Sequence, residues 1–362
     1  METITLQLPK GDAYPILIGY DVREQSGSIL TGLGIAARYV VVTDTNVAAL
    51  HGQRLIEELA GCGLPVEMIA FPAGEASKNI DTVLTIVRQL VKIGADRKTA
   101  LIALGGGVVG DVTGLVASLY MRSIPYLQIP TTLVAQVDSS IGGKTAIDLT
   151  EGKNLLGTFY QPRGVLTDPA FLTTLPEEEF INGLAEVVKY GIIDQGNLFA
   201  LLEKEMAALK QLSSNVLVQV IERCCGIKKT LVEEDEKDQG PRRFLNFGHT
   251  LGHALEAASN YELSHGPGVS LGMIAAARLS EKIGGLSGHD RERIEHLITK
   301  AGLPTTIPRH ISTDLIMLKL AADKKKSGTT INFVLLKAIG SPFVTGEVGE
   351  MMLRETIEGL KR

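Results

Sequence analysis

The sequence predicts a protein of the α/β plus α class, in which an α/β domain built on a mostly parallel sheet precedes a mainly helical domain. Short apolar runs alternate with helical patterns over the first half of the chain, as expected for parallel strands joined by helices. From about residue 175 onward, long segments instead carry apolar residues at helical spacing. The length of 362 residues supports two domains, because single domains commonly have about 100–200 residues.

The N-terminal domain, expected at residues 1–175, contains apolar runs that predict buried strands. The alternating run 4–8 predicts a strand at an edge of the sheet. The apolar stretch 101–121 is long enough to span a bilayer, but it contains Asp111 and five glycines, so we expect a buried strand, a loop and a buried helix there. The buried strands are expected at residues 39–44, 66–71, 99–104 and 126–130, and a helix at residues 79–93.

The C-terminal domain, expected at residues 176–362, begins at Pro176, which three glutamates follow. Proline and acidic residues are favoured in the first turn of a helix. A cleft between two such domains would be a natural ligand site. Helices are expected at residues 182–190, 197–209, 214–232, 249–258, 269–283 and 290–300, and a late strand at residues 331–336.

Charge and cysteine content argue against several classes of protein. Lysine plus arginine is 36 and aspartate plus glutamate is 41, so a net charge of −5 makes non-specific binding to nucleic acid unfavourable. Cys62, Cys224 and Cys225 have no C-x-x-C spacing, which favours a reducing compartment over a disulfide scaffold or a zinc-thiolate site. The first residues lack the features of a signal peptide. We therefore expect a cytoplasmic protein with no nucleic-acid or membrane partner.

Two of the seven histidines, His249 and His253, are four residues apart in a segment expected to be helical. This spacing places both imidazoles on one helix face, where they can act as two metal ligands, or as one ligand and one proton carrier. An exposed turn with two polar side chains would have the same spacing. Glu186 and Lys189 are three residues apart on another expected helix, and an ordinary surface ion pair is the simpler interpretation of them.

Residues 105–110 satisfy the pattern G-x-G-x-x-G directly after a predicted strand, which predicts a nucleotide-binding glycine loop. The usual fingerprint has an acidic residue about 20 residues later, but that region is apolar here, and Asp44 at the end of another strand is the better candidate. Residues 143–145 end like a P-loop, yet Asp138 occupies the position that needs glycine. Lys144 therefore contacts an anion in another way, or it is a solvated surface lysine.

Taken together, these segments resemble the 3-dehydroquinate synthase family, whose members act in the shikimate pathway. Each motif alone has low specificity, but their order along nearly the whole chain is highly specific. The series comprises residues 44–46 (DTN), 72–78 (PAGEASK), 105–111 (GGGVVGD), 129–132 (IPTT), 138–145 (DSSIGGKT), 152–155 (GKNL), 186–191 (EVVKYG), 242–256 (RRFLNFGHTLGHALE), 265–266 (HG) and 323–325 (DKK).

The resemblance implies a Rossmann-like N-terminal domain that holds NAD and a mainly helical C-terminal domain that binds one divalent metal, zinc or cobalt. It implies conversion of 3-deoxy-D-arabino-heptulosonate 7-phosphate to 3-dehydroquinate and phosphate, a step toward chorismate and the aromatic amino acids. The metal ligands of the family map onto Glu186, His249 and His265. His253 would then face the substrate as a proton-transfer or hydrogen-bonding group.

The resemblance also implies the remaining contacts, and a homodimer in which Arg122 reaches a neighbouring subunit. The NAD contacts map onto Asp44, Asn46, Glu75, Lys78, Gly105, Gly106, Gly107, Val108, Gly110, Asp111, Thr131, Thr132, Asp138 and Ser139, with Lys144 and Lys153 near the nucleotide or its substrate. The substrate contacts map onto Asn154, Lys189, Lys228, Arg242, Asn246, His253 and Lys324.

One departure from the family concerns the last metal ligand. The family usually has the sequence His-Gly-Glu-Ala-Val there, whereas this chain has His265-Gly266-Pro267-Gly268-Val269. The missing carboxylate belongs to the kind of outer group that orients a metal-bound imidazole. The departure therefore bears on the orientation of His265 and on its affinity for metal.

Three other functions were weighed against this resemblance. Another sugar-phosphate cyclase, such as a 2-deoxy-scyllo-inosose synthase type, would share NAD, metal and fold but use a substrate without a carboxylate. A metal-dependent polyol dehydrogenase would release NADH. A non-catalytic nucleotide-binding regulator would have little reason to keep metal ligands together with a basic cluster.

Overall fold

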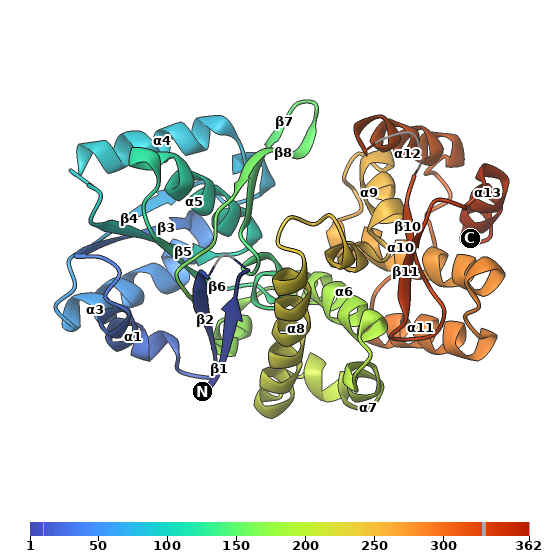
Figure 1. Ribbon diagram of the computed structural model, residues 1–362, viewed down its shortest axis with the longest axis horizontal. Helices are drawn as coiled ribbons and strands as arrows, with labels where there is room; N and C mark the ends of the chain where they lie inside the picture. Colours follow the sequence, from blue (N-terminus) through green and yellow to red (C-terminus); the bar gives the residue numbers. More distant parts are fainter. Residues whose placement is uncertain (10, 328–330, 362) are drawn as a thin grey trace. The chain divides into compact units, whose positions relative to one another are not determined.

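The computed structural model describes residues 1–9, 11–327 and 331–361, and for residues 322–327 it describes the backbone only. The chain forms two compact units (Figure 1). Unit 1 comprises Met1–Pro176 and Leu217–Lys237, and unit 2 comprises Glu177–Val216 and Asp238–Arg362. The domain boundary expected after residue 175 stays a prediction.

A seven-stranded sheet forms the centre of unit 1. Its strand order is β1-β2-β9-β6-β5-β3-β4, and every neighbouring pair is parallel except β1 and β2, which are antiparallel. The predicted mostly parallel sheet and its alternating edge strand are therefore confirmed. The strands are β1 (Glu2–Gln7), β2 (Ala13–Ile18), β3 (Arg38–Asp44), β4 (Val66–Phe71), β5 (Thr99–Gly105), β6 (Tyr126–Pro130) and β9 (Val165–Thr167).

Helices cover both faces of this sheet. Val40 and Val42 of β3 pack in one apolar core with helices α4 (Ile80–Lys92) and α5 (Gly107–Leu119). Tyr39 and Val41 point to the other face and pack in a second core with α1 (Ser26–Leu33) and α3 (Gln53–Gly61). This alternation follows from the two-residue period of a strand, and two covered faces explain why the central strand β5 is buried throughout.

The sheet has a switch point between β3 and β5. The connection from β3 to β4 runs through α3 on one face, whereas β5 leads into α5 on the other. Ligands of open α/β sheets bind at the carboxyl ends of the strands at such a point. Thr43 is the register partner of Leu104, and Gly105 that of Pro130, so the ends of β3, β5 and β6 lie along one edge. Asp44, the glycine loop and Thr131 are therefore at the edge where a nucleotide is expected.

Unit 1 also contains a hairpin, a long helix and several short helical turns. The stretch 101–121 forms β5 and α5, as expected, and within the described residues no helix is both long and apolar enough to cross a membrane. The further elements are η1 (Arg23–Gln25), α2 (Thr45–Val47), η2 (Ala48–Gly52), η3 (Glu75–Ser77), η4 (Tyr120–Arg122), η5 (Ala135–Ser139), β7 (Lys144–Leu149), β8 (Gly152–Phe159), η6 (Pro169–Thr174) and α8 (Ser214–Glu234), whose first turn belongs to unit 2.

Unit 2 is mainly helical, as predicted. Helix α6 starts directly after Pro176, and α10 starts at His265, four residues before the expected start at residue 269. Proline is tolerated in a first helical turn because the N–H groups there lack intrahelical partners. The elements are α6 (Glu177–Ile193), α7 (Leu198–Lys210), η7 (Pro241–Asn246), α9 (His249–Ala258), α10 (His265–Leu279), η8 (Ser280–Gly284), α11 (Gly288–Ala301), α12 (Thr313–Ser327), β10 (Phe333–Leu336), β11 (Pro342–Thr345) and α13 (Glu350–Glu358).

Helices α9 and α10 pack against each other (Figure 1). A Cβ atom at Gly272 would overlap the carbonyl of Gly248, and one at Gly252 would lie 3.0 Å from the carbonyl oxygen of Gly268. Gly248 itself has a φ of +81°, which only glycine adopts readily. These glycines therefore allow α9 and α10, each of which carries a histidine in its first turn, to pack closely.

Candidate active site

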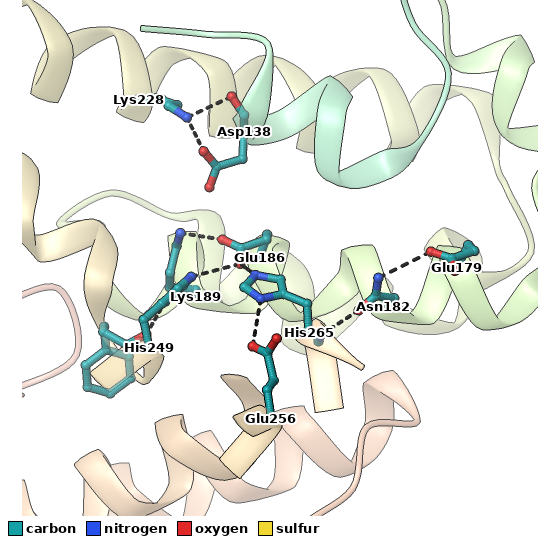
Figure 2. Close-up of polar contacts among 11 residues, drawn as sticks. Asp138, Glu179, Asn182, Glu186, Lys189, Lys228, His249, Glu256 and His265 are labelled. Atoms are coloured by element: carbon teal, nitrogen blue, oxygen red, sulfur yellow. Dashed lines mark hydrogen bonds and ion pairs between the residues drawn. The ribbon is translucent and has the colours of Figure 1, made fainter. Parts of the chain in front are cut away.

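The first turns of α9 and α10 bring two histidines to a glutamate of α6 (Figure 2). Oε1 of Glu186 lies 3.3 Å from Nε2 of His249 and 3.0 Å from Nε2 of His265. The donor atoms of these three residues all lie within 4.8 Å of one another. The structure thus gathers the three side chains that the sequence assigned to a metal.

The donor set fits a divalent metal of the zinc type. Two imidazole nitrogens and one carboxylate oxygen are a common protein contribution to a catalytic zinc site, which leaves further positions open. Bonds of about 2.1 Å at tetrahedral angles would place donor atoms about 3.4 Å apart. The separations of 3.3 and 3.0 Å around Oε1 of Glu186 are close to this value.

Glu186 and Lys189 form a buried ion pair, and the interpretation of this pair as an ordinary surface contact is wrong. Each residue is 1% exposed, and the Lys189 ammonium contacts Oε2 of Glu186, the carboxylate oxygen that does not face the histidines. Burial opposes the charge of Glu186, but Lys189 and His249 outweigh it and hold the pKa of this carboxyl well below its usual range. The glutamate is therefore ionised. Its Oε2 contacts the Lys189 ammonium, and its Oε1 faces the two histidines.

Each of the two histidines has a hydrogen-bond acceptor behind it. The Nδ1–H of His249 donates to the carbonyl of Phe247 at 3.3 Å, and the Nδ1–H of His265 donates to Oε1 of Glu256 at 3.1 Å. With each Nδ1 engaged in this way, Nε2 of each ring is the atom that faces Oε1 of Glu186. In the metal-free protein burial opposes the charge of His265, but its hydrogen bonds to Glu186 and Glu256 raise its pKa to about 10.

His253 lies one turn after His249 and is exposed. Its ring centroid is 5.3 Å from that of His249 and 5.9 Å from that of His265. Its ring nitrogens lie near possible ligand atoms of Glu256 and His265, and it is not part of the group that contains Glu186. Desolvation by the surrounding protein, followed by the charge of His249, lowers the pKa of His253. The lowered pKa keeps the imidazole neutral, so one ring nitrogen can accept a hydrogen bond. Its role toward the substrate stays a prediction.

In unit 1 the glycine loop forms the N-terminus of α5. Gly106 is the N-cap residue and provides no side-chain cap. A Cβ at Gly106 would lie 2.9 Å from Cγ2 of Thr132, and one at Gly107 would lie 3.2 Å from Oγ of Ser139. The glycines therefore let the backbone pack against two of the residues predicted to contact NAD, at a helix end that favours an anion.

Within unit 1, Lys78 contacts one residue predicted to bind NAD, Asp111, and one predicted to bind substrate, Asn154. Its Nζ lies 2.6 Å from Oδ2 of Asp111 and donates to Oδ1 of Asn154 at 2.6 Å. Lys78 is 6% exposed, and burial raises the pKa of Asp111 although Lys78 opposes this rise. The structure therefore brings Lys78, Asp111 and Asn154 together, while their ligand contacts stay a prediction.

Other predicted residues of unit 1 have their own protein contacts. Lys228 of α8 donates to the carbonyl of Asp138 at 2.7 Å and contacts its carboxylate (Figure 2). Asp44 caps α2, with Oδ1 accepting from the backbone N–H of Asn46 at 2.9 Å. Lys153 and Glu75 form an exposed pair at 3.7 Å, Lys144 is exposed at the start of β7, and Arg122 is exposed in a turn with left-handed backbone.

The remaining substrate candidates of unit 2 differ in exposure. Arg242 is 2% exposed and Asn246 is exposed, both in η7. Lys324 falls in α12, but its side chain lies outside the described ones. The structure does not therefore place its ammonium group.

Two residues with a clear structural role were not among the predicted site residues. Glu256 contacts His265, and its position three residues after His253 on a helix was a usable signal. Asp148 accepts from the backbone N–H of Asn154 at 2.8 Å, where Asn154 has a φ of +56°. A contact of this kind across a hairpin depends on the turn and its bulge, which the sequence pattern did not reveal.

Solved structures of two enzymes share this fold over nearly the whole chain. One is 2-deoxy-scyllo-inosose synthase complexed with carbaglucose-6-phosphate, NAD+ and Co2+, with a TM-score of 0.91 and 28% identity, covering 99% of this chain and 100% of that chain. The other is 2-epi-5-epi-valiolone synthase from Streptomyces hygroscopicus subsp. jinggangensis 5008 with NAD+ and Zn2+ bound, with a TM-score of 0.88 and 29% identity, covering 96% of each chain. Fold and donor cluster together define the class of sugar-phosphate cyclases.

Sequence similarity narrows this class to one family. The family model for the N-terminal part of 3-dehydroquinate synthase matches residues 68–182, and that for the C-terminal part matches residues 183–326. The 3-dehydroquinate synthase of Desulforamulus reducens is 44% identical over 348 residues, which cover 96% of this chain and 97% of the relative. The chain belongs to the 3-dehydroquinate synthase family.

Proposed function

We propose that this enzyme converts 3-deoxy-D-arabino-heptulosonate 7-phosphate to 3-dehydroquinate and phosphate, with one divalent metal and NAD as cofactors. The observation that carries the proposal is the convergence of Glu186, His249 and His265, combined with membership of the family. The overall reaction releases phosphate and has no net redox change, because a transient oxidation is later reversed.

The residues assigned to the cofactors follow from the geometry of each unit. Glu186, His249 and His265 would hold the metal, and the edge formed by Asp44, the 105–110 loop and Thr131 would hold NAD. When bound, the metal would supply a Lewis acid for substrate hydroxyls, and NAD would supply a reversible hydride acceptor.

Side chains of this chain would position the metal-binding carboxylate, transfer a proton and hydrogen-bond the substrate. Lys189 holds the second oxygen of Glu186 and so fixes the carboxylate that faces the metal. His253, neutral and open to solvent, would move a proton between substrate and water. Asn246 is exposed beside this helix start and would hydrogen-bond substrate hydroxyls.

A substrate with a phosphate and a carboxylate needs local positive charge in a protein of net charge −5. Arg242, Lys228 and Lys324 are the candidates, with Lys144, Lys153 and Asn154 as additional contacts. Arginine binds a planar carboxylate through two parallel hydrogen bonds, whereas lysine acts as a point charge. Removal of one such buried contact would cost about 2–5 kcal/mol of substrate binding.

The proposal is tested by adding the heptulosonate phosphate to purified protein with NAD and zinc. We expect phosphate release without accumulation of NADH, and no release from a hexose 6-phosphate, which lacks the carboxylate. Phosphate release from the hexose alone would indicate another sugar-phosphate cyclase. Steady accumulation of NADH with glycerol would indicate a polyol dehydrogenase.

Two further expectations belong to this proposal. We expect a homodimer in which Arg122 contacts the substrate bound to the neighbouring subunit, and we expect the enzyme to act in the cytoplasm. Sedimentation measurements test the dimer. An Arg122→Ala protein that stays dimeric but binds substrate with unchanged affinity would contradict the role of Arg122.

A further inference from the structure

We propose that Glu256 is a positioning residue for the metal site, holding His265 in the tautomer and orientation that direct its Nε2 at the metal. The inference deepens the proposed function and rests on it, because it concerns the same metal. It starts from the contact between Oε1 of Glu256 and Nδ1 of His265, at 3.1 Å, shown in Figure 2. A carboxylate can only accept a hydrogen bond, so Nδ1 carries a proton, and Nε2 is the nitrogen that faces Glu186 and would bind the metal.

Burial makes this contact a fixed part of the protein. Glu256 is 3% exposed, so its carboxylate is shielded from solvent, which strengthens its hydrogen bond to His265. Its backbone is also fixed, since its carbonyl accepts from the N–H of Tyr261 at 2.8 Å and from Oγ of Ser259 at 2.9 Å. Glu256 thus reaches His265 from a rigid end of α9.

The neighbouring glycine gives Glu256 the space it needs. A Cβ at Gly268 would lie 3.0 Å from Cγ of Glu256 and 3.6 Å from its Oε1. The methylene groups of Glu256 therefore pass over the first turn of α10 at a point where the chain has no side chain. Pro267, two residues after His265, provides no carboxylate, and the carboxylate beside His265 comes from Glu256 of α9.

The two histidine ligands are supported differently. Nδ1 of His249 faces a neutral backbone carbonyl, whereas Nδ1 of His265 faces a carboxylate. A carboxylate partner makes the imidazole a stronger donor to a metal, and loss of such a partner typically weakens metal binding about 10–100-fold. Glu256 is expected to matter for metal binding even though it does not itself bind metal.

Zinc affinity, measured by competition with a chromophoric chelator, tests the inference without reference to turnover. We expect Glu256→Ala to bind zinc about 10–100-fold more weakly than the unchanged protein. Glu256→Gln should lie between the two, because its amide oxygen accepts the same hydrogen bond without the charge. The matched control is Glu262→Ala, which removes an exposed glutamate of the same unit that contacts His310 at 3.3 Å and should leave zinc affinity unchanged.

Two measurements separate positioning from a general structural role. In a His265→Ala background the additional change Glu256→Ala should not weaken zinc binding further, because the histidine through which it acts is gone. The visible spectrum of the cobalt-substituted protein should change in Glu256→Gln and stay unchanged in Glu262→Ala. Equal weakening by Glu256→Ala with and without His265 would overturn the inference.

Other outcomes are equally decisive. If Glu256→Ala does not fold, Glu256→Gln alone decides, and an affinity equal to that of the unchanged protein overturns the inference. A second equivalent of zinc that Glu256→Gln abolishes would make Glu256 a ligand, together with His253 and His265, rather than a positioning residue. Failure of the unchanged protein to bind zinc at all would contradict the proposed function itself.

Discussion

At the scale of single residues, the pair His249 and His253 divides into two different environments. Nε2 of His249 lies 3.3 Å from Glu186, whereas His253 is exposed and its donors are grouped with Glu256 and His265. Helical spacing placed both on one face but could not say which one meets the glutamate. That choice depends on where α6 and α10 present Glu186 and His265.

This division predicts different effects for two alanine variants. His249→Ala should weaken zinc binding by more than the roughly 10–100-fold expected for loss of an outer partner, because a direct ligand is lost. His253→Ala should keep its zinc and lose about 10²–10⁴-fold in turnover, the usual contribution of a general acid or base. Zinc titration and phosphate release measure the two quantities. Equal loss of zinc in both variants would contradict the division.

The three cysteines predict a pH-dependent pattern of alkylation. Burial raises the pKa of Cys225 from 9.0 to about 12, and Cys224 is also buried, whereas Cys62 is exposed. The thiolate is the reactive form, so iodoacetamide at pH 8.5 should modify Cys62 and spare the other two. Mass spectrometry of the native protein gives the sites, and a Cys62→Ser variant should stay unmodified until it is denatured.

The raised pKa of Cys225 also makes the free energy of unfolding depend on pH. The thiol of Cys225 loses its proton more readily in the unfolded chain, so its contribution to stability is complete below pH 9 and is lost as the pH rises toward 12. Urea unfolding between pH 8 and 11 should show this loss. Stability that increases over this range would contradict the buried thiol.

At the scale of elements, the close backbone contact between α9 and α10 positions the two histidines that are predicted to bind metal. Gly272 lies against the carbonyl of Gly248, so the helices approach more closely than any side chain would allow. Gly226 in α8 offers a comparison, because a Cβ there would meet nothing within 4 Å.

These two glycines predict opposite effects of alanine. Gly272→Ala should destabilise the protein by about 3 kcal/mol or more, because the added methyl would meet backbone. Gly226→Ala should stabilise it by about 0.4–1 kcal/mol, because alanine is the better residue within a helix. Urea unfolding of both variants measures the difference, and a neutral Gly272→Ala would mean that α9 and α10 are packed less closely than described.

At the scale of the whole molecule, the metal candidates all lie in unit 2, whereas the glycine loop and Asp44 lie in unit 1. Ligands that bind only the folded state stabilise it in proportion to the logarithm of their concentration. Metal and NAD should therefore stabilise different parts of the chain.

Removal of the metal should accordingly lower thermal stability. At free zinc of 100 times the dissociation constant, binding is worth about 2.7 kcal/mol, which corresponds to roughly 5–10 °C in the Tm of unit 2 if this unit unfolds by itself. Scanning calorimetry with zinc and with a chelator measures the shift. His249→Ala serves as the control and should show almost no difference between the two conditions. An equal shift in that variant would mean that zinc stabilises the protein elsewhere.

Local sequence patterns predicted many of the strands and helices correctly. The strands at residues 66–71 and 126–130 and the helix His249–Ala258 agree with their predicted ranges, because apolar runs and helical periodicity are strong signals. The prediction that the strand at 66–71 is buried is wrong, because β4 lies at the edge of the sheet and is largely exposed. The strands β2 and β9 and the β7–β8 hairpin were not predicted. Strands β2 and β9 pair with each other although they are far apart in the chain, and β9 has only three residues. The β7–β8 hairpin is local, but β8 is mostly exposed and the register shifts within the hairpin.

The sequence by itself determined the fold class and the family and predicted which residues hold the metal, because ordered motifs and periodicity are properties of the chain alone. Only the tertiary structure decided that Glu186 and Lys189 are buried, that Nε2 of His249 and His265 share one carboxylate oxygen, and that Glu256 supports His265. The physical reason is that burial and hydrogen-bond partners depend on how α6, α9 and α10 pack. That packing depends on glycines at helix contacts, whose effect no local pattern specifies.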